Sequence, residues 1–369
     1  MASLDVVAFK EEAVGAMDMV RQWSKGLEGL LQGLHRHLLK DLALFSVAMT
    51  LARHSHSGRI AANVPSAAKL PSRQRRWERL LHNPRLLPQK VMGRICSGIV
   101  QRLGQRVVLI LDETPNGNTL SCLKLSIGYH KRAIPVGFIC YKHDHPPEPM
   151  PQLLWKLLRR VGRCLPAGCQ VTLLADRGLS WPILLDCCQA LGWHYVLRLQ
   201  SDGKVKLADG SERSLWELAR RRGSRWMGEA EIFKKAGWRK GNLVATWEKG
   251  CKDRWLLITD LPASFQRCRN YCKRSWCEQM HRDEKSSGFC WHASQVRKPD
   301  HAQRLVLVMA LAMLLCLSLG TYLIKRGMRK QMEPTRRRLL SIFQLGVRWL
   351  QNALVQGHSI PAGLYLVPP

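Results

Sequence analysis

Four side chains suited to handling a phosphate and a metal ion occur at helical spacing between residues 271 and 285. The segment YCKRSWCEQMHRDEK carries, at offsets of 0, 3, 7 and 14 residues, Tyr271, Arg274, Glu278 and Lys285. An α-helix turns by about 100° per residue, so these positions fall within roughly 60° of one another. Asp283 and Glu284 point well away from this stripe. Helical geometry therefore selects Glu278 as the acid that acts in the site. It predicts that Asp283 and Glu284 form a polar back, that is, the opposite side of the helix, which takes no part in the site.

Two more acids follow apolar runs that are typical of buried strands. Asp112 follows VVLIL, and Asp176 follows VTLLA. The intervening segment 113–175 suits a hairpin and a crossover helix, and a right-handed crossover would return the second strand parallel to the first. Both acids would then lie at the C-terminal edge of the sheet, where substrate sites are found.

Carboxylates that are forced together repel one another and need a cation or a shared proton, and a divalent metal with oxygen ligands is the simplest answer. We therefore predict that Asp112, Asp176 and Glu278 hold a metal. Each signal alone has an ordinary interpretation, since an Asp at a strand end caps a turn and a helical Arg–Glu pair is a surface salt bridge. A zinc cluster is less favoured, because its spacings of four, five and four lack a Cys-x2-Cys pair. Its ligands would be Cys268, Cys272, Cys277 and His281.

The chain is strongly basic. Its 369 residues include 58 Lys and Arg against 27 Asp and Glu, a formal net charge of +31, which favours nucleic acid or an anionic membrane surface as a partner. The thirteen cysteines are an odd number at irregular spacing, and the N-terminus MASLDVVAFKEEAV has acids where a signal peptide would be basic. We expect a cytoplasmic protein with reduced, structural thiols.

Changes in hydrophobic period divide the chain into five regions. They are a helical DNA-binding region (1–100), the first part of a catalytic core (101–200), a β-rich insertion (201–262), the second part of the core (263–326), and a C-terminal helical region and tail (327–369). Within 101–200 the expected order is strand, hairpin, helix, strand, helix, strand. This order predicts an α/β fold in which helices flank a mixed sheet.

The N-terminal region contains a compact basic helical module. One helix is expected over LEGLLQGLHRHLLKDLALFSVAMTLAR, stopping near Ser57 and Gly58. A second is expected to begin at Ser72 as its N-cap and to end at Asn83–Pro84. Its arginines are predicted to contact DNA phosphates, with a solvated basic face as the alternative. They are Arg73, Arg75, Arg76 and Arg79.

The segment Leu305–Ile324 is apolar and long enough to cross a bilayer. It stands alone, and a helix that is apolar all round is equally suited to the centre of a large core. We predict a buried core helix and no membrane span.

Together these motifs resemble the DDE transposases of the insertion-sequence-four family. The residues of the stripe match the Y-x2-R-x3-E-x6-K signature at every position and spacing, and LDET and LADRG resemble the contexts of the first two acids. Many members have Trp directly after the motif arginine, whereas Ser275 stands there in this chain.

The resemblance implies a ribonuclease-H-like catalytic fold with Asp112, Asp176 and Glu278 as the metal-binding triad, using Mg²⁺, for which Mn²⁺ can substitute. It implies that Tyr271, Arg274 and Lys285 bind DNA phosphates, and that the N-terminal module binds transposon ends. Trp255, in RWLLITDLP, resembles the tryptophan that stacks on a flipped base, with a core aromatic as the alternative.

The function implied is that of a bacterial insertion-sequence transposase, a homodimer in its synaptic complex on double-stranded DNA, associated with the nucleoid when acting. It would hydrolyse a phosphodiester and then transfer the strand to target DNA, with two Mg²⁺ ions. Three alternatives remain at this point: a metal-dependent nuclease of the same fold that does not join DNA, an inactive DNA-binding protein, and a membrane protein built on Leu305–Ile324.

Overall fold

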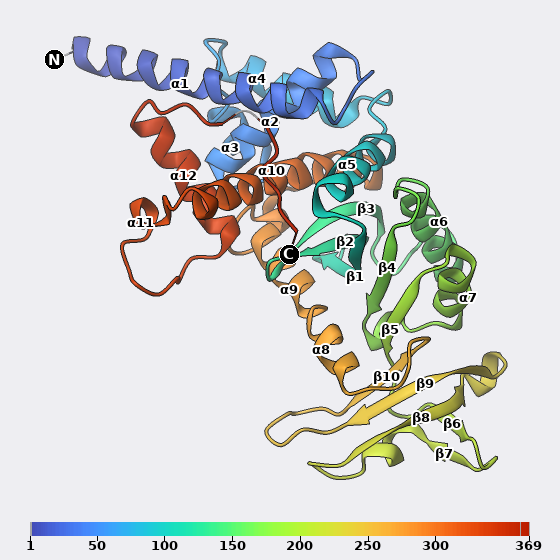
Figure 1. Ribbon diagram of the computed structural model, residues 1–369. Helices are drawn as coiled ribbons and strands as arrows, with labels where there is room; N and C mark the ends of the chain where they lie inside the picture. The colour runs from blue at the N-terminus through green and yellow to red at the C-terminus, as the bar shows by residue number, and fades with distance from the viewer. Residues whose placement is uncertain (1, 362, 369) are drawn as a thin grey trace.

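The computed structural model describes residues 2–361 and 363–368, and a mixed β-sheet forms its central and lower parts in Figure 1. Within these residues the sheet has ten strands in the order β3-β2-β1-β4-β5-β10-β9-β8-β6-β7. The strands are β1 (Arg106–Asn116), β2 (Leu120–Tyr129), β3 (Arg132–Lys142), β4 (Gln170–Ala175), β5 (His194–Arg198), β6 (Lys204–Leu207), β7 (Glu212–Ser214), β8 (Arg225–Ile232), β9 (Arg239–Thr246) and β10 (Trp255–Thr259).

The helices of the described chain cluster mainly around the β1–β5 part of the sheet (Figure 1). They are α1 (Ala2–Glu28), α2 (Arg36–Ala52), α3 (Ser57–Ala62), α4 (Leu70–His82), α5 (Pro88–Leu103), α6 (Met150–Gly162), α7 (Pro182–Leu191), α8 (Gln266–Cys272), α9 (Ser275–Glu284), α10 (Pro299–Lys325), α11 (Arg329–Met332) and α12 (Ile342–Val355). The predicted mixed α/β architecture with flanking helices is confirmed.

The strand pairing brings the first two predicted acids together. β1 and β4 are parallel neighbours, and their register pairs Leu111 with Ala175, so that Asp112 and Asp176 follow at the same edge. The predicted parallel return is therefore confirmed. Asp112 is not the last residue of β1, however, because the strand continues to Asn116 along β2, where Asp112 pairs with Lys124.

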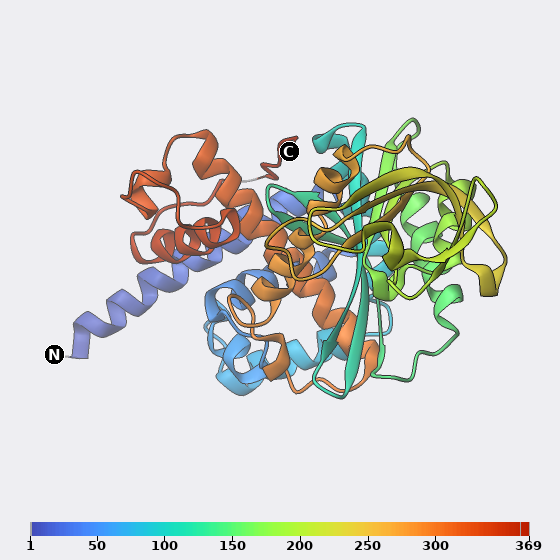
Figure 2. The same ribbon diagram turned by 90° about the horizontal axis from the view of Figure 1, so that it is seen from below.

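The β-rich segment after β5 does not form a sheet of its own. β10 pairs antiparallel with β5 and with β9, so β6 to β9 extend the central sheet. In Figure 1 these strands make the lower end of the molecule, opposite the helical N-terminal and C-terminal segments. In Figure 2, seen from below, they lie in front of the central strands. The last strand of this extension returns the chain to α8 and α9, and the residues of the stripe lie on these helices or directly beside their ends.

The apolar segment Leu305–Ile324 forms most of α10, which is buried among α2, α12 and β3. By length and composition this helix could cross a membrane, but 89% of its most apolar window is buried inside the protein. Two glycines allow α10 and α12 to meet backbone to backbone. A Cβ on Gly320 would lie 1.9 Å from the carbonyl oxygen of Ile342, and one on Gly346 would lie 1.8 Å from that of Cys316. α10 is thus packed as a core helix.

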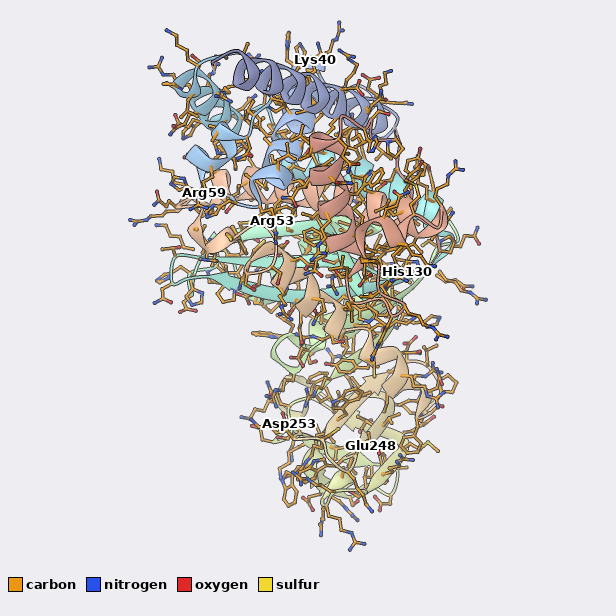
Figure 3. The ribbon with its side chains drawn as sticks, turned by 90° about the vertical axis from the view of Figure 1, so that its left-hand side faces the viewer. Lys40, Arg53, Arg59, His130, Glu248 and Asp253 are labelled. Atoms are coloured by element: carbon orange, nitrogen blue, oxygen red, sulfur yellow. The ribbon has the colours of Figure 1, made fainter. Side chains whose placement is uncertain are left out.

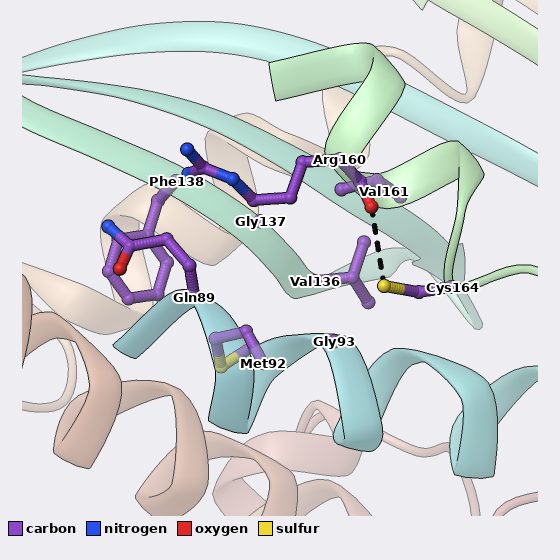
Figure 4. Close-up of a pocket in the computed structure, with 9 residues that line it drawn as sticks. All are labelled: Gln89, Met92, Gly93, Val136, Gly137, Phe138, Arg160, Val161 and Cys164. Carbon is purple, nitrogen blue, oxygen red and sulfur yellow. Dashed lines mark hydrogen bonds between the residues drawn. The ribbon is translucent and has the colours of Figure 1, made fainter. Parts of the chain in front are cut away.

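Close packing also joins α5, β3 and α6. A small, mainly apolar gap between them is lined by side chains such as Met92, Val136 and Val161 (Figure 4). A Cβ on Gly137 would lie 2.6 Å from Cγ2 of Val161, which is why β3 carries a glycine under α6. None of the predicted site residues lines this gap, so it belongs to the core and not to a site.

Three details of the N-terminal helices differ from prediction. The helix expected over residues 27–53 is broken between α1 and α2, where Gly33 adopts a positive φ of 74°. The expected stop at Ser57 is the first residue of α3, because the real stop is Arg53 in the left-handed conformation. Ser72 lies inside α4, whose N-cap is Lys69.

The N-terminal and C-terminal helical segments are in contact: α1 packs beside α12, as both views show (Figures 1 and 2).

Candidate active site

One guanidinium joins the three predicted acids. Nη2 of Arg274 lies 2.9 Å from Oδ1 of Asp112 and 3.4 Å from Oδ2 of Asp176. Nη1 of Arg274 donates a short hydrogen bond to Oε1 of Glu278, one turn along the helix. The side chains of Arg274 and Asp112 are 13% and 14% exposed, whereas Glu278 is 57% exposed. The structure therefore collects the three carboxylates around a single positive charge at a half-open edge of the sheet.

Burial and charge act in opposite directions on this cluster. Burial lowers the pKa of Arg274, but the nearby carboxylates, Asp112 above all, raise it more, and the net effect is a pKa above its usual value. Burial raises the pKa of Asp112, but His281 and Arg274 outweigh burial and bring this pKa below its usual value. Asp112 is thus held as a carboxylate at neutral pH, the form that binds a cation.

Tyr271 and Trp255 lie on the Asp176 side of the cluster. The hydroxyl of Tyr271 donates a 3.2 Å hydrogen bond to Oδ1 of Asp176. Burial, and next the charge of Asp176, raise the pKa of Tyr271, so its phenol remains a donor. The ring of Trp255, at the start of β10, packs edge-on against Tyr271 with 5.3 Å between ring centroids. Trp255 is half-buried, and Tyr271 links its ring to Asp176.

Lys285 was expected on the same helix as the other stripe residues, but it lies just beyond the end of α9. The stripe is not one helix: α8 ends at Cys272, α9 begins at Ser275, and Lys285 follows the end of α9 with φ −97° and ψ −95°. Its ammonium donates a 2.8 Å hydrogen bond to the carbonyl oxygen of Pro115, three residues beyond Asp112 on β1. The break changes the backbone path, but it leaves Tyr271 and Arg274 in contact with the two Asp residues and Glu278 in contact with Arg274.

The prediction that Asp283 and Glu284 form a polar back is wrong. Glu284 is 1% exposed and forms a 2.5 Å ion pair with Nζ of Lys124, which is completely buried. Asp283 is 2% exposed and lies 2.7 Å from Nε of Arg132. Both acids therefore pair with basic residues of the sheet, Lys124 on β2 and Arg132 on β3. These buried ion pairs hold α9 on the sheet. Helical phase alone could not show this, because it does not say which face of α9 meets the sheet.

Burial would raise the pKa of Glu284, but Lys124 and the adjacent His281 lower it to about 2. Burial raises the pKa of Asp283 to about 6, with Arg132 opposing the shift. Lys124 also lies over the ring of Trp291, 4.8 Å from its centroid, so its charge is balanced from two sides. Glu284 therefore remains an ionised carboxylate in the folded protein at neutral pH, one helical turn from His281.

The second oxygen of Asp112 has partners that the sequence did not assign to the acids. Oδ2 lies 3.2 Å from Sγ of Cys277 and 3.2 Å from Nε2 of His281. The zinc cluster weighed from the sequence does not form as such. Among the described residues, the group placed to hold a metal joins Cys277 and His281 to Asp112, without Cys268 or Cys272. The i, i+4 spacing of Cys277 and His281 was a usable signal, but their partner is distant in sequence.

Arg198 is a further neighbour of the acids that the sequence analysis missed. It ends β5, and its Nη1 lies 3.9 Å from Oδ1 of Asp176 while Nη2 lies 3.8 Å from Oδ2 of Asp253. A basic residue at the C-terminal end of the strand beside β4 could have indicated this position. Arg198 adds a second positive charge near Asp176.

The four arginines of α4 are divided between structure and solvent. Arg73 donates to the carbonyl oxygen of Val64, and Arg76 makes a 2.6 Å ion pair with Asp41 on α2. Arg75 and Arg79 are exposed. The helical part also presents Lys40, Arg53 and Arg59 on the face shown in Figure 3. The basic surface is therefore broader than α4, and only part of α4 faces solvent.

The chemistry of the donor set suits divalent cations. Asp112, Asp176 and Glu278 supply carboxylate oxygens, the ligands that Mg²⁺ and Mn²⁺ prefer. Their negative charges are balanced by the guanidinium of Arg274, which is the kind of partner that a cation could replace. As they stand, the three acids meet through Arg274 and their oxygens do not all lie within 4.8 Å of one another, so a cation held by all three would have to displace that guanidinium.

Comparisons with known proteins point to the same region. A family model described as a transposase DDE domain matches residues 105–315, which is more than half of the chain. The match begins one residue before β1 and ends inside α10, so it includes all three acids and the extension between them. Among curated proteins, no sequence matches the chain.

Proposed function

Because this chain belongs to the family of proteins with a transposase DDE domain, we propose that it is the transposase of a bacterial insertion sequence of the insertion-sequence-four family. Members of this family act on DNA and generally use divalent metals. The finer assignment is supported by the Tyr271-x2-Arg274-x3-Glu278-x6-Lys285 signature. The sheet order β3-β2-β1-β4-β5, with a parallel centre, supports a ribonuclease-H-like core.

The observation that carries the proposal is the gathering of Asp112, Asp176 and Glu278 around Arg274. These three acids would hold the divalent cations, Mg²⁺ or Mn²⁺. When bound, such cations would activate the nucleophile and neutralise charge on the phosphate. The reaction needs little acid–base help from side chains, because in-line phosphoryl transfer depends mainly on positioning and charge.

Two successive displacements at phosphorus make up the proposed reaction. Water attacks the phosphodiester at the transposon end, the P–O3′ bond breaks, and a 3′-hydroxyl and a 5′-phosphate result. That hydroxyl then attacks a phosphodiester of target DNA, and its oxygen replaces the target's 3′-oxygen on phosphorus. No oxidant or energy cofactor is needed, since each step exchanges one P–O bond for another.

The remaining residues of the stripe would position the DNA. Arg274 and Lys285 would contact phosphate oxygens beside the cut, and Tyr271 would donate its hydroxyl there. Trp255 would stack on a base that has left the duplex. The net charge of +31 supports binding of double-stranded DNA along the length of the protein, with the N-terminal helices on transposon ends and two copies in the synaptic complex. We place this activity in the cytoplasm, at the nucleoid.

The test is cleavage of DNA that carries the element's own terminal repeats. Asp112→Asn keeps the size of the side chain and removes its charge, so we expect cleavage to fall by at least about 10²-fold while DNA binding remains. The matched control is Glu113→Gln on the other face of β1, where the carboxylate lies beside Tyr141. Cleavage by Asp112→Asn at the rate of the unaltered protein would refute the assignment of the acids.

A second assay separates a transposase from a nuclease of the same fold. Pre-cleaved transposon ends with free 3′-hydroxyls are supplied together with a plasmid target. We expect joined products that depend on Mg²⁺ or Mn²⁺ and are lost in Asp112→Asn. Cleavage of intact ends without any joining of pre-cleaved ends would instead identify a nuclease.

A further inference from the structure

Three different donor atoms converge beside the acid cluster. Sγ of Cys277 and Nε2 of His281 each lie 3.2 Å from Oδ2 of Asp112, and all three atoms lie within 4.8 Å of one another. Cys277 and His281 are one turn apart on α9, so they project together toward β1. Arg274, in contrast, contacts the other oxygen, Oδ1.

These separations match a tetrahedral metal site. Bonds of about 2.0–2.1 Å to nitrogen or oxygen and about 2.3 Å to sulfur give ligand-to-ligand separations of about 3.3–3.6 Å in a tetrahedron. The two measured 3.2 Å separations are within a few tenths of an ångström of these values. To take up an ion, Sγ of Cys277 and Nε2 of His281, which lie no more than 4.8 Å apart, would have to be at about 3.6 Å.

The imidazole of His281 is oriented as a metal ligand would be. Its Nδ1 lies 3.1 Å from Oε2 of Glu284, and that carboxylate is fixed by the buried ammonium of Lys124. Metal-binding histidines are commonly held by a carboxylate on their second nitrogen. The residue is 9% exposed, and Nε2, which points at Asp112, is buried without a hydrogen bond of good geometry. The imidazole is therefore buried, and its Nε2 is oriented toward Asp112 as that of a metal ligand would be.

We propose that Asp112, Cys277 and His281 form a site for a borderline divalent cation, with Zn²⁺ as the best-suited ion, and that an ion held there withdraws Asp112 from the acid triad. Thiolate and imidazole select Zn²⁺ and Co²⁺ over Mg²⁺, whereas the all-oxygen set of the triad suits Mg²⁺. Because both sets need Asp112, the two sites compete. Zinc binding is independent of the proposed function; the resulting inhibition of DNA cleavage rests on it.

The experiment uses Co²⁺ as an optical substitute for Zn²⁺, on the full-length protein without DNA. We expect a thiolate-to-cobalt charge-transfer band with one-to-one stoichiometry, displaced by Zn²⁺ and not by millimolar Mg²⁺. Cys277→Ser should abolish the band, and Asp112→Asn should weaken Co²⁺ binding at least tenfold. Cys272→Ser is the matched control: that thiol lies on α8, is exposed and is not one of the donor atoms that converge with Asp112, so the band should persist.

Circular dichroism and the melting temperature of each variant verify that it is folded. If a variant does not fold, X-ray absorption at the zinc edge of the unaltered protein decides instead, with one sulfur and further nitrogen or oxygen ligands expected. A band that is absent from the unaltered protein, or that survives in Cys277→Ser, overturns the proposal. Since this readout contains no DNA, it can fail while the transposase assignment stands, and the reverse also holds.

A final measurement addresses competition. In the cleavage assay with Mg²⁺ in excess, Zn²⁺ should inhibit the unaltered protein and Cys272→Ser at the same concentration that fills the optical site. Raising Mg²⁺ should restore cleavage, as expected when two ions compete for Asp112. Inhibition that Mg²⁺ cannot reverse, or that needs far more Zn²⁺ than optical saturation, contradicts the competitive relationship.

Discussion

The guanidinium of Arg274 donates a 2.9 Å hydrogen bond to Oδ1 of Asp112, a residue 162 positions away in the sequence. The same nitrogen lies 3.4 Å from Asp176, so one positive charge serves two acids on parallel neighbouring strands. Without that charge, the carboxylates would repel one another in a largely buried setting. Arg274 therefore maintains the cluster before any metal ion is bound.

Replacing Arg274 should make the protein depend on metal for its stability. We expect Arg274→Met to lower the free energy of unfolding by about 3 kcal/mol in EDTA, because Asp112 and Asp176 lose their partner. Ca²⁺ or Mg²⁺ should recover more stability in this variant than in the unaltered protein, as measured by thermal melting. Arg269→Met, at an exposed position on α8, is the control. An equal metal-induced shift in Arg274→Met and in the unaltered protein would contradict this role.

The buried pair Lys124–Glu284 should behave as a unit. Removing one partner, in Lys124→Met or Glu284→Leu, leaves an uncompensated buried charge and should lower the free energy of unfolding by about 3–5 kcal/mol. The double variant should be less destabilised than the sum of the two, since no lone charge remains. Urea titrations of all four proteins measure the coupling. Simple additivity would show that the two side chains do not interact.

The same pair predicts an acid transition. The pKa of Glu284 is about 2 in the folded protein and 4.5 in the unfolded chain, so its contribution is complete above pH 4.5 and is lost as pH falls toward 2. Melting temperatures should therefore fall more steeply over this interval in the unaltered protein than in the Lys124→Met, Glu284→Leu double variant. Parallel curves for the two proteins would assign the acid transition to other carboxylates.

Trp255 should affect a late step of the DNA reaction. After the first nick, the freed 3′-hydroxyl can attack the opposite strand and close a DNA hairpin, a strained step that a flipped base would assist. Substitution to Ala should retain the first nick but reduce any such hairpin product at least tenfold, because base–aromatic stacking contributes about 1–3 kcal/mol. Trp255→Phe should recover part of this loss. The control is Trp238→Ala, in the turn between β8 and β9. If Trp255 only packs against Tyr271, nicking and hairpin formation should instead decline together, which gel analysis of the products will reveal.

The division of the α4 arginines predicts two different phenotypes. Arg75→Ala with Arg79→Ala should weaken DNA binding and reduce the slope of log affinity against log salt by about 2, one for each lost phosphate contact. Arg73→Ala and Arg76→Ala should instead lower the melting temperature, because these side chains bond to Val64 and Asp41. Fluorescence anisotropy over a salt series distinguishes the pairs. An unchanged slope in the Arg75, Arg79 variant would exclude α4 from the DNA-binding surface.

Local patterns in the sequence were sufficient for the strands that carry Asp112 and Asp176. Each acid follows a continuous apolar run, a signal of a strand buried on both faces, and the length between them allowed the parallel return that the structure has. The burial of Leu305–Ile324 was also predictable, since a solitary apolar helix in a basic α/β chain suits the core. These inferences succeeded because they depend on patterns within short segments and on one general rule for how parallel strands are connected.

What only the tertiary structure decided is which distant groups meet α9. Periodicity placed Glu278 opposite Asp283 and Glu284, but it could not show that the latter pair is buried on β2 and β3 by Lys124 and Arg132. Nor could it pair Cys277 and His281 with Asp112, because a long-range contact depends on how the helix is docked and not on its own phase. The sequence alone selected Asp112, Asp176 and Glu278 as candidates and located the two strands that lead to the first two. The docking of α9 on the sheet decided their partners, through the burial of charges that must be paired.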